Sequence, residues 1–351
     1  MRVFLRFFDT IIRKNQTRNR TLRLVMRDDF QDRIFQIRES EFSEFALELF
    51  QFQYELNPVY QDYARGLGKS PGNVQTLSEI PFMPVDFFKT YAVQTGSFHP
   101  SMIFETSGTT QQRAGRHLVK DLSLYEKSFL TGFQKFYGPV TDWTIIGLLP
   151  SYLERKGSSL IFMVDELIKE SDHEKSGFYL NEFERLSATL HDLEKNRERT
   201  LLLGVSFALL DFAERFPMPL DHTILMETGG MKGRRKEITR SELHDQLKER
   251  FSLARIHSEY GMTELLSQSY ARADGLFESV PWMRILVRGE DDPLQVADEG
   301  PGLINIIDLA NIYSCAFIAT DDIGHIHTDG KFEILGRMDG SALRGCSLMV
   351  V

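Results

Sequence analysis

The hydrophobic positions of the chain follow a helical period near its start. Four apolar side chains recur at the spacing of one helix face between residues 41 and 54: Phe42, Phe45, Leu49 and Phe52. A helix with such a face buries it against other elements, because burial removes the apolar surface from water. The pattern therefore predicts a helical N-terminal region over residues 1–79, packed on a core.

Beyond the segment IPFMPVDFFKT at residues 80–90, short apolar runs alternate with amphipathic stretches. The stretches predict helices over 124–136, 182–196 and 237–250, and the runs predict strands over 144–150, 201–206, 223–230 and up to Gly261. This alternation favours an α/β core with mainly parallel sheets flanked by helices, which we assign to residues 80–280. Ligands of such cores bind at the carboxyl ends of the strands.

The last part of the chain, residues 281–351, is rich in strand patterns. The runs MRILVRG and LINIIDLA are followed by HIHT and KFEILGR, which Asp329 and Gly330 join. An Asp-Gly pair between two such runs is typical of a β-hairpin. We therefore expect a β-rich subdomain at the C-terminal end.

Composition narrows the class of protein. Of the 351 residues, 42% are hydrophobic, which is enough for a sizeable core, and the net charge of -9 argues against broad nucleic-acid binding. The two cysteines, Cys315 and Cys346, are too few for a disulfide framework, and no apolar run is long enough for a transmembrane segment. We expect a cytoplasmic protein whose partners are small molecules or proteins, with Cys315 in the core.

The segment FETSGTTQQRAGRH at residues 104–117 gathers hydroxyls and glycine ahead of cationic side chains. Its residues include Thr106, Ser107, Gly108, Thr109 and Thr110, followed by Arg113, Arg116 and His117. Backbone N–H groups and hydroxyls in such a loop can surround phosphate oxygens while the cations offset their charge. The alternative is a solvated turn without a ligand.

Like this segment, two further glycine turns follow predicted strands of the α/β pattern, ETGGMKGRR at 227–235 and HSEYGMTE at 257–264. Their joint occurrence at strand ends indicates one crevice that binds one polar ligand. The second turn places Thr263 before Glu264, and so offers a hydroxyl to phosphate and a carboxylate to Mg²⁺. The alternative puts Glu264 in the first turn of a helix.

Two carboxylates, Asp321 and Asp322, precede Gly324 in ATDDIGHI. Such a pair is either a solvated turn or a ligand for ribose hydroxyls. Arg337 follows the predicted hairpin and could approach the same ligand, a nucleotide if Asp321 or Asp322 binds its ribose.

Four motifs in the order TSGTT, EYGMTE, TDDIG and GRMDG resemble those of the adenylate-forming enzymes, the acyl-CoA synthetase and luciferase superfamily. More narrowly, IPFMPVDFFKT, SGTT with His117, EYGMTELLSQ and GRMDGSALRGC are similar to the acyl-protein synthetase family, the long-chain fatty acid ligase component of bacterial bioluminescence reductase complexes. The resemblance extends from about Ile80 to Cys346. It implies a ligase that uses ATP and Mg²⁺ to activate a fatty acid or another carboxylic acid, and an acceptor protein, a reductase or carrier, that receives the acyl group.

The resemblance also implies a role for each residue of the motifs. Residues Thr106 to Thr110 with Arg113 and His117 would hold phosphates, Gly229, Gly230 and Met231 would line adenine, and Tyr260 and Gly261 would lie at the nucleotide. Thr263 would contact the α-phosphate, Glu264 would hold Mg²⁺, Asp322 would bind ribose, and Arg337 would reach ribose or phosphate. Cys346 would carry the acyl group, with Arg344 favouring its thiolate; the alternative is a buried apolar cysteine.

The sequence departs from the superfamily in its phosphate loop and at its C-terminal end. Gln111 stands where glycine is common, and Arg113 or Arg116 where lysine is usual. We find no candidate for the lysine of the superfamily's mobile C-terminal domain, and expect that domain to be absent or vestigial, as in the acyl-protein synthetase branch. The alternatives are an acyl-CoA or phenylacetate-type aryl-CoA ligase and a non-catalytic nucleotide- or lipid-binding scaffold.

Overall fold

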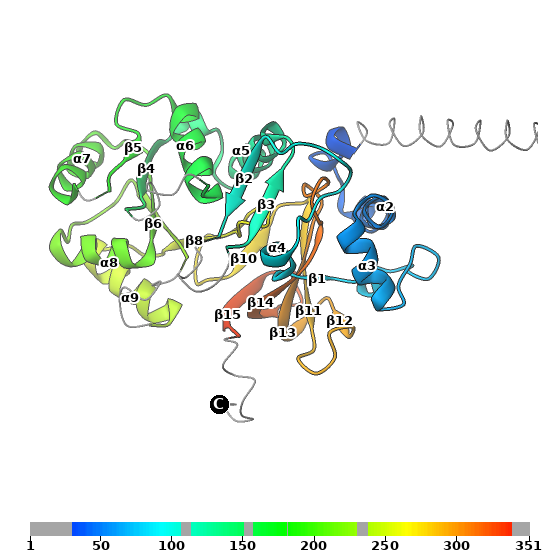
Figure 1. The fold of residues 1–351 in the computed structure, drawn as a ribbon. Coiled ribbons are helices and arrows are strands. Elements are labelled where there is room, and N and C mark those ends of the chain that lie inside the picture. Colours follow the sequence, from blue (N-terminus) through cyan, green and yellow to red (C-terminus); the bar gives the residue numbers. More distant parts are fainter. Residues whose placement is uncertain (1–29, 107–113, 151–156, 181, 230–237, 339–351) are drawn as a thin grey trace, which may run out of the picture.

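A computed structural model describes residues 30–106, 114–150, 157–180, 182–229 and 238–338 of the chain. Within these residues, one continuous sheet of 13 strands runs through the molecule (Figure 1). Its strand order is β12-β11-β13-β14-β15-β10-β9-β8-β7-β6-β4-β5, with β1 paired to β14. The pairings from β5 to β8 are parallel and those from β8 to β12 are antiparallel, so the sheet is mixed.

The parallel part of the sheet contains the strands predicted in the middle of the chain. They are β4 (Thr144–Leu148), β5 (Gly177–Phe178), β6 (Thr200–Val205), β7 (Thr223–Thr228) and β8 (His257–Tyr260). Every residue of β4 and β6 is buried, as expected of central strands covered on both faces. The α/β prediction is thus confirmed for this part, apart from small shifts of the strand ends.

Five helices cover the parallel part. They are α5 (Leu122–Tyr137), α6 (Ser159–Ser171), α7 (Phe183–Asn196), α8 (Ser206–Arg215) and α9 (Arg240–Phe251). His257 of β8 contacts Tyr137 of α5, whereas its neighbour Ser258 contacts His244 of α9. Because successive residues of a strand point to opposite faces, α5 and α9 lie on opposite sides of the sheet. The three predicted helices of this region are confirmed.

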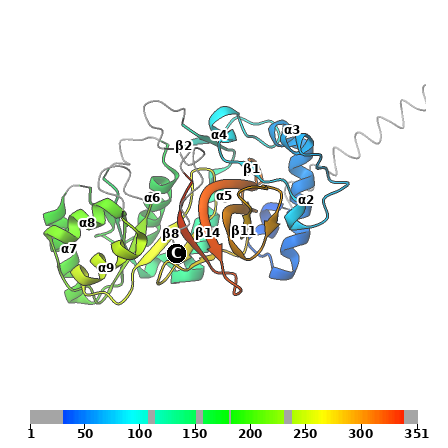
Figure 2. The ribbon, with the colours of Figure 1, turned by 90° about the horizontal axis from the view of Figure 1, so that it is seen from below.

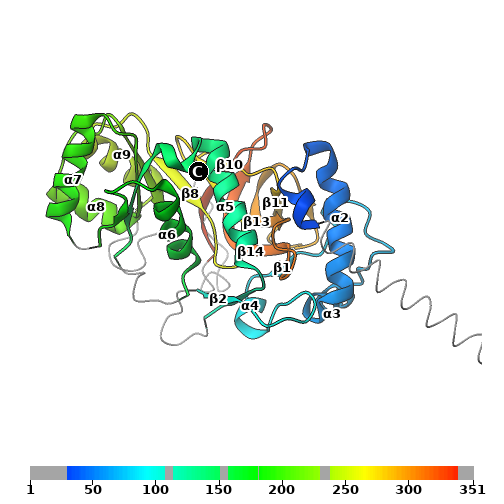
Figure 3. The same ribbon diagram turned by 90° about the horizontal axis from the view of Figure 1, so that it is seen from above.

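The N-terminal helices lie against the antiparallel part. They are α2 (Glu39–Leu56) and α3 (Pro58–Gly66), and the first confirms the helix predicted from residues 41 to 54. Phe50 of α2 packs edge-on against Phe317 of the sheet. Seen from below and above, α2 and α3 lie at one end of the molecule and α7 to α9 at the other (Figures 2 and 3). Shorter helices lie at Leu77–Glu79, Phe87–Thr90 (α4) and Val140–Asp142.

The antiparallel part contains the β-rich section that the sequence predicted. Its strands are β9 (Ser269–Ala271), β10 (Phe277–Ser279), β11 (Met283–Arg288), β12 (Val296–Ala297), β13 (Gly300–Asp308), β14 (Phe317–Ile326) and β15 (Phe332–Arg337), with β1 (Met83–Pro84) beside β14. The hairpin of β14 and β15 turns at Gly330, whose φ of 80° favours glycine. Asp321 and Asp322 lie within β14, so the solvated-turn alternative for them is wrong.

The segment around Thr106 does not follow a strand of the main sheet. β2 (Met102–Glu105) and β3 (Arg116–Val119) form a separate antiparallel pair, and residues 107–113 between them lie outside the described residues. Our expectation that this segment follows a strand of the parallel pattern is corrected accordingly. Two four-residue strands give no period from which their pairing could be read.

The core runs through both parts of the sheet, and Cys315 is fully buried in it, as predicted. The division into residues 1–79, 80–280 and 281–351 stays a prediction. None of the described helices combines the length and apolar character that crossing a bilayer requires.

Candidate functional site

Two of the three glycine turns follow neighbouring parallel strands, Gly229 after β7 and Gly261 after β8. Gly229 has a φ of 69°, which favours glycine, and its carbonyl accepts a hydrogen bond from the Ser206 hydroxyl. A Cβ at Gly261 would lie 2.5 Å from Oε1 of Glu259 and would displace that carboxylate. Both turns lie at the sheet edge where parallel strands bind ligands.

Glu264, the acidic residue after β8, is almost fully buried, with 3% of its surface exposed. It lies in a turn and not in a helix, because the chain reverses at once to pair Ser269 of β9 with Tyr260 of β8. The helical alternative is therefore wrong. Burial raises the pKa of Glu264 to about 7, and the positive charges of Arg337 and Lys89 oppose this rise. A cation bound at this carboxyl would favour its ionised form.

Thr106 and Glu264 both lie close to Gly115. The hydroxyl of Thr106 accepts a hydrogen bond from the N–H of Gly115 at 2.8 Å, and the two main chains pair at 3.0 Å. A Cβ at Gly115 would lie 2.9 Å from Oε1 of Glu264 and 3.2 Å from Cγ2 of Thr106. The β2–β3 pair therefore brings the start of the hydroxyl-rich segment to the acidic turn.

His117 of β3 contacts the same turn from the protein interior. Its ring is fully buried, and Nδ1 lies 2.9 Å from the main-chain oxygen of Thr263, to which it donates as an N–H. Burial lowers the pKa of His117 to about 4, so the ring is neutral near pH 7. This geometry favours a role that acts through Thr263.

Tyr260, Asp322 and Arg337 form the other side of the arrangement. The hydroxyl of Tyr260 donates to Oδ2 of Asp322 at 2.7 Å, and Nε of Arg337 lies 3.9 Å from Oδ1 of the same carboxylate. Burial raises the pKa of Asp322, and the bond from Tyr260 and the charge of Arg337 oppose this rise. Because the charges of Arg337 and Asp322 also act on Glu264, the hairpin and the acidic turn border one region.

The structure thus brings together most of the predicted site residues that it describes. They are Thr106, His117, Tyr260, Gly261, Thr263, Glu264, Asp322 and Arg337, with Gly229 on the adjacent strand end. The others lie outside the described residues: Ser107, Gly108, Thr109, Thr110, Arg113, Gly230, Met231 and Cys346.

Three residues around Glu264 were missed by the sequence analysis. The charge of Lys89 in α4 acts on Glu264, Gly115 leaves room for its carboxylate, and Asn311 donates from Nδ2 to its main-chain oxygen at 2.7 Å. Lys89 and Gly115 lie inside the segments DFFKT and RAGRH that we had singled out, so a signal for them existed. Asn311 lies in none of these segments, and only the fold brings it to the turn.

The residues around Glu264 can hold a magnesium ion if a bound nucleotide supplies most of its oxygen ligands. Among the described residues, no group of three or more His, Cys, Asp or Glu side chains is arranged to hold a metal ion. Magnesium commonly binds through one or two carboxylates, with phosphates and water as its other ligands. The Glu264 carboxylate beside Thr106 suits this mode, in which a nucleotide supplies the remaining oxygens.

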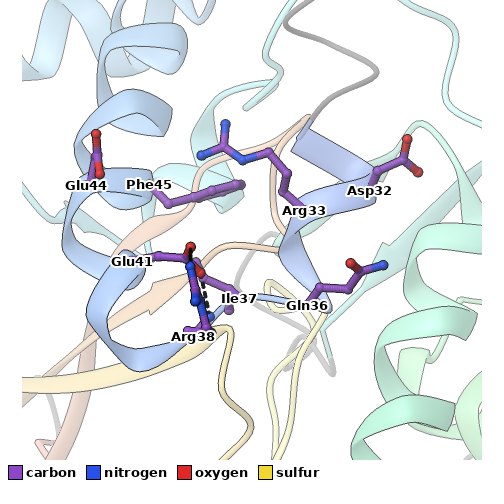
Figure 4. A pocket seen from close by; sticks show the side chains of 8 residues that line it. All are labelled: Asp32, Arg33, Gln36, Ile37, Arg38, Glu41, Glu44 and Phe45. Carbon is purple, nitrogen blue, oxygen red and sulfur yellow. Dashed lines mark hydrogen bonds and ion pairs between the residues drawn. The ribbon is translucent and has the colours of Figure 1, made fainter.

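A separate surface hollow of about 440 Å³ lies at the start of the described chain. Eight residues line it: Asp32, Arg33, Gln36, Ile37, Arg38, Glu41, Glu44 and Phe45 (Figure 4). Charged side chains surround it, and Arg38 pairs with Glu41 across one edge. It shares no residue with the arrangement around Glu264.

The sequence was compared with family models and with curated proteins. No family model matches the chain. A curated relative, the long-chain-fatty-acid–luciferin-component ligase of Aliivibrio fischeri, is 22% identical over 360 residues, which cover 93% of this chain and 94% of that protein. This relative confirms the resemblance to the acyl-protein synthetase family.

Solved structures decide the fold. The 2-hydroxyisobutyryl-CoA ligase, crystallised in an open conformation with 2-HIB-AMP and CoA, matches 85% of this chain and 74% of its own with a TM-score of 0.64 at 12% identity. The chain has the fold of the adenylate-forming ligases. ATP-bound MatB from Rhodopseudomonas palustris matches 69% of the chain with a TM-score of 0.52 at 17% identity. The chain spans about half the length of MatB, 49% of which is matched.

The four motifs come from four places along the chain: the β2–β3 pair, the end of β8, the middle of β14 and the end of β15. In the sheet β10 and β9 lie between β15 and β8, and the side-chain hydrogen bond from Tyr260 to Asp322 connects β8 to β14 across them.

Proposed function

We propose that this protein is an ATP-dependent ligase that activates a long-chain fatty acid as its acyl-adenylate and transfers the acyl group to a protein cysteine thiol. The observation that carries the proposal is the meeting of Glu264, Thr106 and the Tyr260–Asp322–Arg337 group at the carboxyl end of β8. The name of the curated relative supports the choice of a long-chain fatty acid. The ATP bound to a protein with the same fold supports the choice of ATP.

In this proposal the nucleotide lies across the ends of β7 and β8. Asp322 accepts hydrogen bonds from the ribose hydroxyls, and Arg337 places its positive charge near ribose or the phosphates. Thr263 contacts the α-phosphate, and the segment that begins at Thr106 and includes Arg113 surrounds the other phosphates. Gly229, Gly230 and Met231 line the adenine.

Glu264 would hold a magnesium ion together with phosphate oxygens, and the bound ion would supply charge neutralisation and orientation of the phosphates. To bind the ion, the carboxylate of Glu264 must be ionised. Its raised pKa means that protons compete with the ion below about pH 7.

Adenylation makes the acid reactive because it replaces a poor leaving group with AMP. A carboxylate oxygen bonds to the α-phosphorus of ATP, the bond from that phosphorus to the bridging oxygen breaks, and pyrophosphate leaves with the electron pair. Arg337 and Thr263 stabilise the charge that develops around this phosphorus, because fixed donors in a water-poor site need little reorganisation.

Transfer then needs a nucleophile, for which we propose Cys346. Its thiol loses a proton to solvent, the thiolate sulfur bonds to the acyl carbonyl carbon, and the bond to the AMP oxygen breaks, which leaves a thioester and free AMP. Arg344 favours the thiolate through its positive charge. The acyl group then passes to an acceptor protein, a reductase or carrier. We place this chemistry in the cytoplasm, where cysteine thiols stay reduced.

An acyl-CoA ligase is the second candidate, because the 2-hydroxyisobutyryl-CoA ligase with the same fold was crystallised with CoA. A screen of aliphatic and aromatic acids separates the two functions when the products are analysed with and without CoA. The first candidate predicts acid-dependent AMP release and acylated protein without CoA, and the second predicts a soluble CoA thioester. ATP binding without any acid-dependent product would support a non-catalytic scaffold instead.

A further inference from the structure

Two buried side chains from the segment after β13 and the end of that strand, Asn311 and Asp308, make hydrogen bonds to the turn that carries Thr263 and Glu264. Asn311 donates from Nδ2 to the main-chain oxygen of Glu264 at 2.7 Å. Two residues further on, the N–H of Leu266 donates to Asp308 at 2.8 Å, and the hydroxyl of Ser267 donates to the same carboxylate at 2.6 Å. We call Asp308 and Asn311 the brace.

The brace is itself fixed from helix α2. Gln53 donates from Nε2 to the main-chain oxygens of Asn311 and Ile312 at 2.9 and 3.0 Å, and its Oε1 accepts from the N–H of Ala316 at 2.9 Å. The side chains of Gln53, Asp308 and Asn311 are all fully buried. Because these groups are buried away from solvent, their hydrogen bonds form a continuous connection from α2 to the main chain of Glu264.

Asn311 also lies beside His117, which holds the preceding carbonyl. His117 bonds to the oxygen of Thr263 and Asn311 to that of Glu264, so two successive carbonyls of the turn are held by side chains. Among the described residues, Oδ1 of Asn311 and Nε2 of His117 have no hydrogen-bond partner while the ring is neutral, because both atoms are then acceptors. A protonated ring would donate to Asn311, which is how Asn311 raises the pKa of His117 against the larger effect of burial. With the neutral ring, the bond that Asn311 makes to the turn is the one to Glu264.

We propose that Asn311 is a positioning residue, which fixes the main chain of Glu264 so that its carboxylate meets the metal and phosphates of bound ATP. The inference rests on the proposed function, because the nucleotide is what the carboxylate would meet. Loss of the bond releases the main chain of Glu264 without changing the chemical identity of its carboxylate. Partners of metal-binding side chains typically contribute about 10-fold to 100-fold to metal affinity.

Calorimetric titration with ATP, without any acid substrate, tests the proposal apart from turnover. The full-length chain and its Asn311→Leu variant are each titrated with ATP in chelator and again in Mg²⁺. Leucine is similar in volume but has no donor. We expect the Mg²⁺-dependent gain in ATP affinity to fall about 10-fold or more, and affinity for ATP in chelator to change less than about twofold.

Asn305→Leu is the matched control. Asn305 is also a fully buried asparagine with one unpaired amide atom among the described residues, but its Oδ1 accepts from Arg288 at 2.8 Å, and within the described part of the chain its side chain makes no hydrogen bond to the turn. This variant should keep the Mg²⁺-dependent gain even where it lowers the melting temperature.

An unchanged Mg²⁺-dependent gain in Asn311→Leu, or an equal loss in both variants, would overturn the positioning role. Should Asn311→Leu not fold, Asn311→Ser, which replaces the amide by a shorter side chain with a hydroxyl, is measured in the same way against the same expectations. If the unmodified protein binds no ATP in either buffer, the proposed function fails and takes this inference with it. That result is distinct from a loss confined to the variants.

Discussion

Three buried glutamates at the ends of the parallel strands differ in their surroundings. For Glu227, burial opposes ionisation, but the bond from His244 and the charge of Arg240, whose Nε lies 3.1 Å away, lower its pKa. Burial raises the pKa of both Glu259 and Glu264 to about 7. Of the three, Glu264 is the one with Gly115 and Thr106 beside its carboxylate. Local contacts thus lower the pKa of Glu227, whereas burial raises those of Glu259 and Glu264.

Glu259→Gln should remove one source of pH dependence from stability. In the folded chain Glu259 keeps its proton up to about pH 7, whereas an unfolded glutamate loses it near 4.5. The stabilisation by the protonated group is therefore complete below pH 4.5 and is lost as the pH rises through 7. Urea unfolding should show equal stability near pH 4, and at pH 8 an advantage for the variant of up to roughly 3 kcal/mol. An advantage that does not vary with pH would contradict the raised pKa.

At the scale of the element, the β14–β15 hairpin carries Asp322 and Arg337 to the site. The two residues are direct register partners, and the register shifts between Ile323 and Gly324 immediately afterwards. Irregularities of this kind re-aim a side chain. Here the shift lies next to Asp322, whose carboxylate meets Tyr260 of β8.

Gly324→Ala should disrupt this hairpin. A Cβ at position 324 would lie 2.5 Å from the main-chain oxygen of Glu333 and 2.6 Å from Cδ1 of Ile304, and backbone cannot give way as a side-chain end can. We expect a loss of about 1 to 3 kcal/mol in urea unfolding. Gly336→Ala, in the facing strand, is the control, because a Cβ there has nothing within 4 Å. Equal stability of the two variants would show that strand packing at Gly324 is looser than described.

At the scale of the whole molecule, the sequence predicted those helices and strands that show in the local pattern of apolar residues. The helix at residues 41–54 and the strands of the parallel part follow from their periods. The residue pattern alone left open whether Glu264 begins a helix and whether Asp322 lies in a turn. Strand pairing answered both questions, because β9 returns along β8 and β15 runs along β14.

The brace was not predictable in this way. Gln53 and Asn311 are 258 positions apart in the sequence, and neither belongs to a periodic run that would connect them. Their hydrogen bonds exist only because α2 packs on the antiparallel part of the sheet. Similarly, Lys89 and Gly115 were within singled-out segments, but their proximity to Glu264 depends on the folding of α4 and the β2–β3 pair.

The transfer step makes a prediction about the two cysteines. Cys346→Ser should keep acid-dependent pyrophosphate exchange but lose labelling by a radioactive acyl chain, because a serine hydroxyl is a far weaker nucleophile than a thiolate. Cys315→Ala is the control: this thiol is fully buried, and burial raises its pKa to about 12, so the variant should still be labelled. Labelling that persists in Cys346→Ser would place the thioester elsewhere.

The central claim is that Glu264 and the groups around it form one site that activates a carboxylic acid with ATP. The most direct measurement is acid-dependent exchange of labelled pyrophosphate into ATP, with Glu264→Gln as the test variant and Glu259→Gln as the buried control. We expect exchange with long-chain fatty acids in the parent and in Glu259→Gln, and a loss of about 100-fold or more in Glu264→Gln, as removal of a key charge-stabilising group commonly gives. Exchange that is unchanged in Glu264→Gln would contradict the account.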